Sequence, residues 1–312
     1  MVDPVRAEAR SLFLSALHDS DRVLVTGAGG WFGSTVAALL HGSGHPAAFT
    51  TQRPRVVSHG WGVVEAIGWN WNAVQDFAPT VVFDCAFVLR DYVNSMPIEQ
   101  YVHANTVVTA RLLQLAHLPS VRAVISVSSG AAVHPQDAGV RGVEADPYGY
   151  LKRQAELALL AVGETVAARV VVARSWSLSG ALVTRPERYA FSNLVMQARS
   201  GVIRVEAAHE VWRRYVGVDD FFAVALAKAA GSSGVLDSGG ELIEFGGLAQ
   251  RICDALSVTV EIRRPAPSGQ VADEYYSRSD AWDAACSDVG LAPASLDDQV
   301  VDVDAYLRGL VR

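Results

Sequence analysis

The segment that decides the fold is Val23-Leu-Val-Thr-Gly27-Ala-Gly-Gly30-Trp-Phe-Gly33, an apolar run followed by closely spaced glycines. The run predicts a buried strand over 22–26, and the residues after the glycines predict a helix. Glycines at such a turn allow a sharp bend, a close approach of a diphosphate and tight packing of the helix on the strand. The helix N-terminus also offers free N–H groups to phosphates. We therefore predict a dinucleotide-binding turn at Gly27, Gly30 and Gly33, although a glycine-rich turn without a ligand is the alternative.

The rest of the first half alternates between β-branched runs and helical stretches. Such alternation is typical of a parallel sheet flanked by helices, so we predict an α/β fold with a Rossmann-type doubly wound sheet. The strands are expected at 46–51, within 56–67, and at 80–87, 123–127 and 169–173, and the helices at 4–18, 98–115 and 147–162.

After residue 175 the pattern changes to shorter elements with more glycine. We expect residues 1–175 to form the dinucleotide-binding Rossmann domain. Residues 176–312 are expected to form mainly a smaller, mixed α/β lobe that binds substrate, with some return to the Rossmann sheet.

The composition argues against several classes of protein. Of the 312 residues, 50% are apolar and 19% are charged, and the net charge is −7. Nucleic-acid binding requires clustered cations, so an acidic chain disfavours it. The sequence has no apolar run of the roughly 18 residues that a spanning helix needs, and its N-terminus has no apolar core of signal-peptide type. We expect a soluble, cytoplasmic protein that binds neither nucleic acid nor membrane.

Metal and disulfide sites are not expected either. Cys85, Cys253 and Cys286 are widely spaced and odd in number, which is typical of small buried residues. The eight histidines show no metal-ligand spacing.

The end of the second strand bears on the choice of dinucleotide. NAD specificity usually depends on a carboxylate there, which binds the ribose 2′-hydroxyl. This chain has Thr51 and Arg53 in that region and no carboxylate. An arginine can pair with a 2′-phosphate, so the sequence favours NADP over NAD. The alternative for Arg53 is an ordinary solvated charge.

Tyr148 and Lys152 lie four residues apart at the start of a predicted helix and so share one face. A phenol with a pKa of about 10 is a poor acid or base at neutral pH, and a neighbouring ammonium lowers that pKa. Only two of the 26 basic residues are lysines, which makes the pairing notable. We predict that Tyr148 is a catalytic acid/base and that Lys152 tunes it and binds the nicotinamide ribose. An ordinary amphipathic helix is the alternative.

Hydroxyl groups end the strand that precedes this helix. Ser128 and Ser129 lie at its carboxyl end, where open α/β sheets bind their ligands. Either serine is a candidate to orient a substrate oxygen beside Tyr148.

These residues resemble the extended short-chain dehydrogenase/reductase family, in particular its nucleotide-sugar epimerases and dehydratases. The resemblance covers nearly the whole chain. It is carried by the glycine turn, the strand that ends near Ala86, Asn105, the 126–135 strand end, the Tyr148/Lys152 pair, Arg174, and the segments 193–195, 213–220 and 242–247.

The resemblance implies hydride transfer at a ring hydroxyl or ketone of a nucleotide sugar, with NADP or NAD as cofactor. It implies that Asn193 and Arg213 bind the substrate diphosphate and that Ser129 contacts the sugar. It also implies a homodimer formed through the helices at 98–115 and 147–162. The further cofactor contacts that it implies are Trp31, Phe32, Ala86, Asn105 and Trp176.

Two positions depart from the family pattern. Gly130 stands where the family has serine or threonine, and Trp176 stands where it usually has asparagine. The Gly-Ala-Ala stretch also lacks the extra acidic residue of a dehydratase, which favours an epimerase or ketoreductase. Two alternatives stay open. One is an NADP-dependent reductase of a small non-sugar carbonyl, and the other is a cofactor-binding protein with weak or no catalysis.

Overall fold

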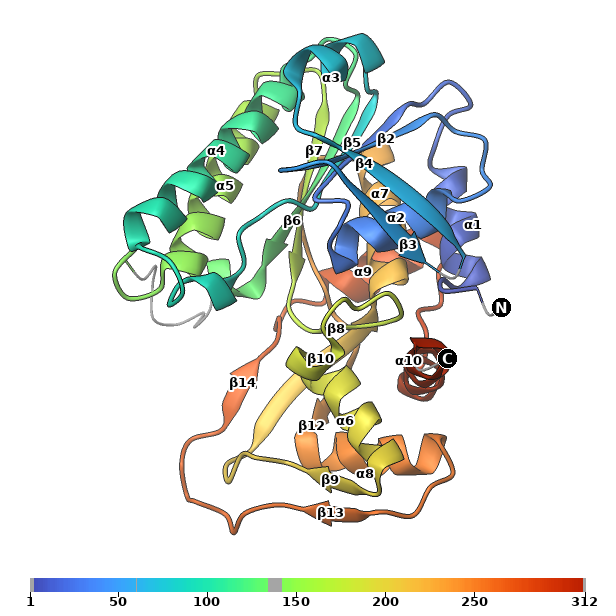
Figure 1. Ribbon diagram of the computed structural model, residues 1–312, viewed down its shortest axis with the longest axis vertical. Coiled ribbons are helices and arrows are strands. Elements are labelled where there is room, and N and C mark those ends of the chain that lie inside the picture. The colour runs from blue at the N-terminus through green and yellow to red at the C-terminus, as the bar shows by residue number, and fades with distance from the viewer. Residues whose placement is uncertain (1–2, 60, 134–141, 311–312) are drawn as a thin grey trace.

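The computed structural model describes residues 3–59, 61–133 and 142–310, and its main body is built on a mostly parallel eight-stranded sheet (Figure 1). The strand order is β11-β7-β6-β5-β1-β2-β4-β3, and only the β3–β4 pair among these is antiparallel. This order confirms the Rossmann-type fold. The strands are β1 (Val23–Thr26), β2 (Ala47–Thr51), β3 (Arg55–His59), β4 (Gly62–Gly68), β5 (Val81–Asp84), β6 (Ala123–Ser129), β7 (Arg169–Ser175) and β11 (Gly234–Asp237).

Helices cover both faces of this sheet, each through its own apolar core. On one face α2 and α7 pack on the strands, with α1 and α9 against them; on the other lie α3, α4 and α5 (Figure 1). β1, β5 and β6 are buried along their whole length, which explains their continuous apolar runs. The helices are α1 (Ala7–Ser15), α2 (Trp31–Leu40), α3 (Trp71–Phe77), α4 (Ile98–Ala116), α5 (Pro147–Gly163), α7 (Val218–Gly231) and α9 (Ala281–Val289).

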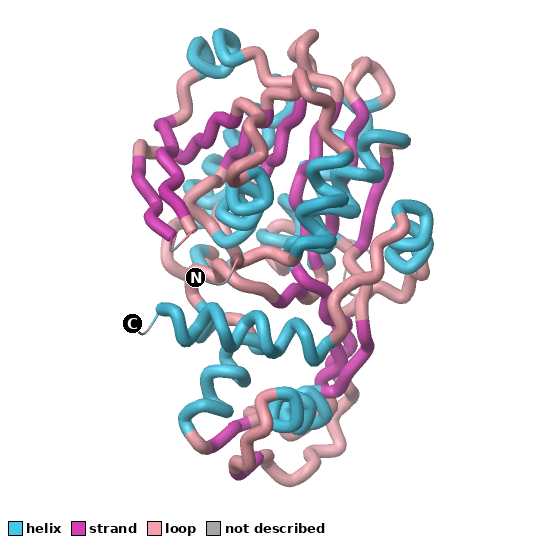
Figure 2. The backbone as a smooth tube through the Cα atoms, turned by 90° about the vertical axis from the view of Figure 1, so that its right-hand side faces the viewer, coloured by secondary structure: helices cyan, strands magenta, loops and turns pink. Residues whose placement is uncertain are grey.

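The second half of the chain builds a smaller lobe with a separate apolar core. Figure 2 shows it below the main sheet, with α10 running across the molecule between them. β11, α7 and α9 come from the same half of the chain but join the main body. The elements of the lobe are β8 (Leu178–Ser179), α6 (Ala190–Ser200), β9 (Val202–Arg204), β10 (Val211–Gly217), β12 (Glu241–Glu244), α8 (Phe245–Ala255), β13 (Glu261–Arg263), β14 (Asp273–Tyr275) and α10 (Leu296–Leu310).

Two local features differ from the sequence-based expectation. The stretch 56–67, where one strand was expected, forms the β3–β4 hairpin. Helix α3 was not predicted; the Asn70 side chain caps it by accepting a hydrogen bond from the Ala73 N–H at 3.1 Å. The last residues of the 126–135 motif, His134 and Pro135, lie outside the described residues.

Within the described part of the chain, no helix is long and apolar enough to cross a membrane. The same residues form no cluster of three or more histidine, cysteine or acidic side chains that could hold a metal ion.

Candidate active site

The glycine turn between β1 and α2 forms a tight backbone cradle at the N-terminus of α2. Gly27 has a φ of +64°, and a Cβ there would lie 2.6 Å from the Cys85 carbonyl oxygen. A Cβ on Gly33 would lie 2.6 Å from the Cα of Ala28. Gly30 is the N-cap of α2 in an extended conformation. At Gly27 and Gly33 a side chain would meet neighbouring backbone, so glycine is what lets the turn approach the end of β5 and lets α2 pack against the turn. The free N–H groups at the start of α2 then suit the phosphates of a dinucleotide.

Trp31 and Phe32 turn their side chains away from this cradle. The Trp31 indole donates a hydrogen bond to the Ala181 carbonyl at 2.8 Å, and the Phe32 ring packs 5.9 Å from that of Phe222. Their backbone N–H groups belong to the first turn of α2, where no carbonyl within the helix can accept from them. What these two residues offer to a phosphate is therefore their backbone.

The arginine that lies over the glycine turn is Arg55, whereas the sequence indicated Arg53. The Thr51 hydroxyl donates to the Arg53 carbonyl at 2.6 Å, and Arg53 itself is exposed. Arg55, the first residue of β3, lies over the turn: a Cβ on Gly29 would be 2.7 Å from its Nη1. No local pattern indicated this contact, because it depends on the β3–β4 hairpin.

Asn105 anchors the loop that follows β5. Its buried side chain accepts a hydrogen bond from the Val88 N–H at 2.8 Å and donates to the Val88 carbonyl at 3.3 Å. The nearby N–H of Ala86 donates to the buried Asp84 carboxylate. Asn105 therefore fixes the loop in this structure, with both ends of its amide engaged by Val88.

Tyr148 lies in the first turn of α5 and is partly exposed. The edge of its ring meets Phe87, with ring centroids 5.7 Å apart, and the Arg90 guanidinium lies 5.2 Å above the ring. Burial raises the pKa of the Tyr148 phenol, and the adjacent phenol of Tyr275 raises it further, while a hydrogen bond with Ser129 lowers it. The net direction is upward, opposite to the lowering that the sequence predicted.

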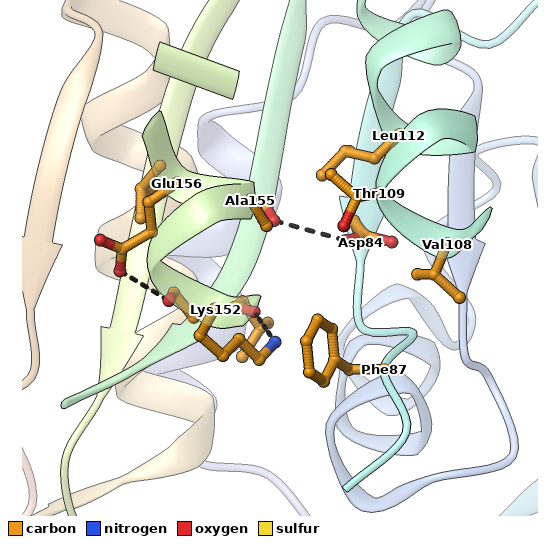
Figure 3. Close-up of a pocket in the computed structure, with 12 residues that line it drawn as sticks. Asp84, Phe87, Val108, Thr109, Leu112, Lys152, Ala155 and Glu156 are labelled. Atoms are coloured by element: carbon orange, nitrogen blue, oxygen red, sulfur yellow. Dashed lines mark hydrogen bonds between the residues drawn. The ribbon is translucent and has the colours of Figure 1, made fainter. Parts of the chain in front are cut away.

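The side chain of Lys152 explains this difference. Its ammonium group turns inward, donates to the Val127 carbonyl at 2.8 Å and lies 3.8 Å from the centre of the Phe87 ring (Figure 3). Burial lowers the pKa of Lys152 to about 8, although the charges of Asp84 and Glu156 oppose that shift. The Lys152 side chain lines a small cavity of about 10 Å³, which has room for about one water molecule.

The two candidate serines have different surroundings. The Ser128 hydroxyl donates to a Glu156 carboxylate oxygen at 2.6 Å, in the interior. The Ser129 hydroxyl lies 3.1 Å from the hydroxyl of Tyr275 and forms the hydrogen bond with Tyr148. Ser129 is thus the serine that meets the Tyr148 phenol. Tyr275 comes from β14 in the lobe, and nothing in the local sequence indicated it.

Glu156 is a second residue that the sequence analysis missed. It is 2% exposed and receives two hydrogen bonds of 2.8 Å each from the Arg174 guanidinium. Its only local signal is a carboxylate four residues after Lys152 on the buried face of α5. The hydrogen bonds of Glu156 with Ser128 and with Arg174 therefore connect α5 to the ends of β6 and β7.

The two predicted substrate residues of the lobe are held by neighbouring groups. The Arg213 guanidinium pairs with the Asp273 carboxylate at 2.7 Å and lies 5.5 Å above the Tyr275 ring. Asn193, in the first turn of α6, donates to the Glu187 carbonyl at 2.8 Å and accepts a hydrogen bond from Gln197. Arg213 and Ser129 therefore both contact Tyr275, which lies between Arg213 and the Ser129–Tyr148 hydroxyls.

A family model described as the NAD dependent epimerase/dehydratase family matches residues 23–234. The chain belongs to this family. No curated protein matches the chain in sequence.

Several solved structures share the fold of this epimerase/dehydratase family member at low identity. MoeE5 in complex with UDP-glucose and NAD is 20% identical, with 93% of this chain and 100% of that chain covered and a TM-score of 0.70. The UDP-glucose 4-epimerase of Thermotoga maritima with UDP-glucose is 20% identical over the same shares, with a TM-score of 0.71. The NAD dependent NDP-hexosamine 5,6-dehydratase TunA is 19% identical over 93% and 98% of the two chains, with a TM-score of 0.72.

The two departures from the family pattern form a matched pair in this member. A Cβ on Gly130 would lie 2.3 Å from a carbon of the Trp176 ring. Trp176 is 6% exposed, and its indole N–H donates to the Asp237 carboxylate at 2.6 Å. The indole therefore occupies the space that a serine side chain at position 130 would need.

Replacing Gly130 by serine is expected to destabilise the protein by about 1–3 kcal/mol, because overpacking forces the indole of Trp176 from its place. In a Trp176→Asn background, the same replacement should cost clearly less. Urea unfolding of the two single variants and the double variant measures this coupling. Equal costs of Gly130→Ser in both backgrounds would show that the two positions are independent.

Proposed function

We propose that this chain is an NAD(P)-dependent enzyme that acts on a nucleotide-activated sugar, as an epimerase or a ketoreductase. Family membership and the diphosphate cradle at the glycine turn support the use of a dinucleotide. The observation that carries the proposal is the meeting of the Ser129 and Tyr148 hydroxyls at the carboxyl end of β6. Ligands of open α/β sheets bind at this edge.

The residues of the chain divide the chemistry among themselves. A bound dinucleotide supplies hydride acceptance and return at its nicotinamide ring. Tyr148 takes the proton of a sugar hydroxyl as the carbon loses hydride, or returns a proton to a ketone oxygen in the reverse direction. Ser129 hydrogen-bonds the same oxygen and holds it beside the phenol. Because burial raises the pKa of Tyr148, the resting phenol is protonated at neutral pH and ready to donate to a ketone oxygen. To take the proton of a sugar hydroxyl, the phenol must first release its own proton to solvent.

Arg213 and Asn193 are proposed to bind the substrate diphosphate. Arg213 lies beside Tyr275, whose hydroxyl is 3.1 Å from that of Ser129, so a diphosphate at Arg213 sets its sugar toward the catalytic hydroxyls. To bind a phosphate, Arg213 exchanges its contact with Asp273 for one with the ligand.

For the cofactor, we propose a preference for NADP. Arg55 lies over the glycine turn, Arg53 is exposed just after β2, and β2 ends without a carboxylate. Either guanidinium suits a 2′-phosphate.

Replacing Arg55 by alanine is expected to weaken NADPH binding about tenfold, the value of roughly one charge-assisted contact, and to leave NADH binding little changed. Quenching of tryptophan fluorescence measures both affinities, and Arg53→Ala separates the parts played by the two arginines. If the unaltered protein binds NADH more tightly than NADPH, the preference is wrong.

One observation favours a second function, the reduction of a small non-sugar carbonyl. The rings of Trp176 and Tyr275 lie 5.0 Å apart and place apolar surface beside Ser129. Apolar surface of this kind suits a compact substrate without a diphosphate.

We also propose a homodimer through α4 and α5. On these helices Ile98 is 37% exposed and Leu157 is 45% exposed, so they place apolar side chains at the surface. Light scattering gives the mass in solution, and a monomer at all concentrations contradicts the dimer.

The experiment that tests the proposed function is a thermal-shift screen of nucleotide sugars in the presence of NAD or NADP. A specific ligand raises the melting temperature by mass action, and a hit is then incubated and its product identified by NMR. We expect a nucleotide sugar to stabilise the protein and to be epimerised or reduced. Stabilisation by small ketones alone supports the second function and overturns the first.

A further inference from the structure

The loop between β5 and α4 is held firmly where it passes the active site. Asn105 binds both backbone groups of Val88, and the Tyr101 hydroxyl donates to the Val88 carbonyl at 2.9 Å. Two residues later, the Arg90 guanidinium pairs with the Asp146 carboxylate at 3.2 Å. Asp146 is the N-cap of α5, where it accepts a hydrogen bond from a first-turn N–H. Arg90 therefore bridges the loop and the helix turn that carries Tyr148.

The phenol of Tyr148 meets polar groups from every element packed against it. Arg90 is the cation above its ring, with the guanidinium carbon 5.2 Å from the ring centre. Lys152 lies on α5 with Tyr148, but its ammonium contacts Val127 and Phe87 and not the Tyr148 ring. The groups that face Tyr148 are Ser129 from β6, Tyr275 from β14, Tyr101 from α4 and Arg90 from the β5–α4 loop. The Asp146 carboxylate at the start of α5 pairs with Arg90.

We propose that Arg90 is a positioning residue for Tyr148. The Arg90 guanidinium favours the ionised phenol of Tyr148 and holds the Tyr148 ring at the end of β6. A guanidinium over an aromatic face is attracted by the ring, and more strongly once the ring carries a negative charge. Asp146 takes part by keeping the guanidinium in place. This role rests on the proposed function, because it acts through the acid/base residue of that reaction.

The direction of the effect follows from electrostatics. Burial and the Tyr275 phenol disfavour the Tyr148 phenolate, while the charge of Arg90 opposes them. The Arg90 side chain is 59% exposed, so solvent screens part of its attraction to the Tyr148 phenolate. A single screened charge at this distance shifts a pKa by roughly one unit.

The test needs neither substrate nor cofactor. A fluorinated tyrosine, whose pKa lies below that of tyrosine, is incorporated at position 148 of the full chain, and its ionisation is followed by fluorine NMR across the neutral and alkaline range. The variants are Arg90→Gln, Arg90→Lys, and Arg188→Gln as the matched control. Arg188 is also an exposed arginine with an aspartate partner, but that partner is Asp91.

We expect Arg90→Gln to raise the midpoint of the position-148 phenol by roughly one unit, Arg90→Lys to restore most of the shift, and Arg188→Gln to leave it unchanged. An unchanged midpoint in Arg90→Gln overturns the proposal, and so does an equal shift in the control. Circular dichroism of each variant confirms that the fold is kept. A failure of this titration leaves the proposed function standing, since turnover is measured separately with Tyr148→Phe.

Discussion

A Tyr148→Phe variant should lose turnover by about 10²–10⁴-fold, the usual contribution of a positioned acid or base. The change removes one oxygen and keeps the ring that packs against Phe87, so we expect the local structure to be unchanged. Cofactor and nucleotide-sugar affinities should stay close to those of the unaltered protein. Steady-state kinetics gives the loss as a fall in kcat, and fluorescence titration gives the affinities.

Tyr150→Phe is the matched control for this prediction. Tyr150 lies two residues further along α5, so its side chain projects in a different direction from that of Tyr148. It should leave kcat unchanged. If Tyr148→Phe turns over as fast as the unaltered protein, Tyr148 is not the acid/base of the reaction.

Replacing Glu156 by alanine should lower the free energy of unfolding by about 3–5 kcal/mol, as is typical when one partner of a buried ion pair is removed. The change leaves the Arg174 guanidinium, whose side chain is 12% exposed, without the carboxylate that takes two of its hydrogen bonds. It also leaves the buried Ser128 hydroxyl without its acceptor. Chemical denaturation followed by tryptophan fluorescence gives the loss.

Two further variants make this result specific. Glu164→Ala, at the exposed end of the same helix, should change stability by no more than about 0.5 kcal/mol. The double variant Glu156→Leu with Arg174→Met should recover much of the loss, because apolar residues of similar size replace the buried pair. If Glu156→Ala is as stable as the unaltered protein, the pair is not what joins α5 to the strand ends.

The features that the sequence predicted well are local ones. The glycine turn, the buried strands and the start of α5 at Pro147 each depend on a few consecutive residues, and the structure places them where the pattern indicated. Gly27 illustrates the reason: its positive φ and its contact with Cys85 are requirements that almost no other residue type meets.

The contacts that complete the site could not be predicted, because they join residues far apart in the chain. Tyr275 reaches Ser129 from a strand of the lobe, and the position of Arg55 depends on a hairpin whose two strands the sequence did not separate. The spacing of Tyr148 and Lys152 indicated a shared face but not the direction of the ammonium. That direction depends on Val127, which lies in β6, and on Phe87, which lies in the loop after β5.

The pairing of Gly130 with Trp176 shows the same limit. Each position departed from the family pattern by itself, and the sequence offered no reason to connect residues 46 positions apart. In the structure, the absence of a side chain at Gly130 leaves the space that the Trp176 ring occupies.

The central claim is that the Tyr148 phenol exchanges a proton with the substrate beside a bound nicotinamide. A crystal structure of the complex with a dinucleotide and the nucleotide sugar found by the screen tests it most directly. We predict that the Tyr148 hydroxyl lies within roughly 2.6–3.2 Å of the reacting sugar oxygen. We also predict that Ser129 is hydrogen-bonded to the same oxygen. A complex in which the sugar oxygen contacts another acid or base, while Tyr148 stays against Phe87 and Arg90 without meeting the ligand, would contradict the claim.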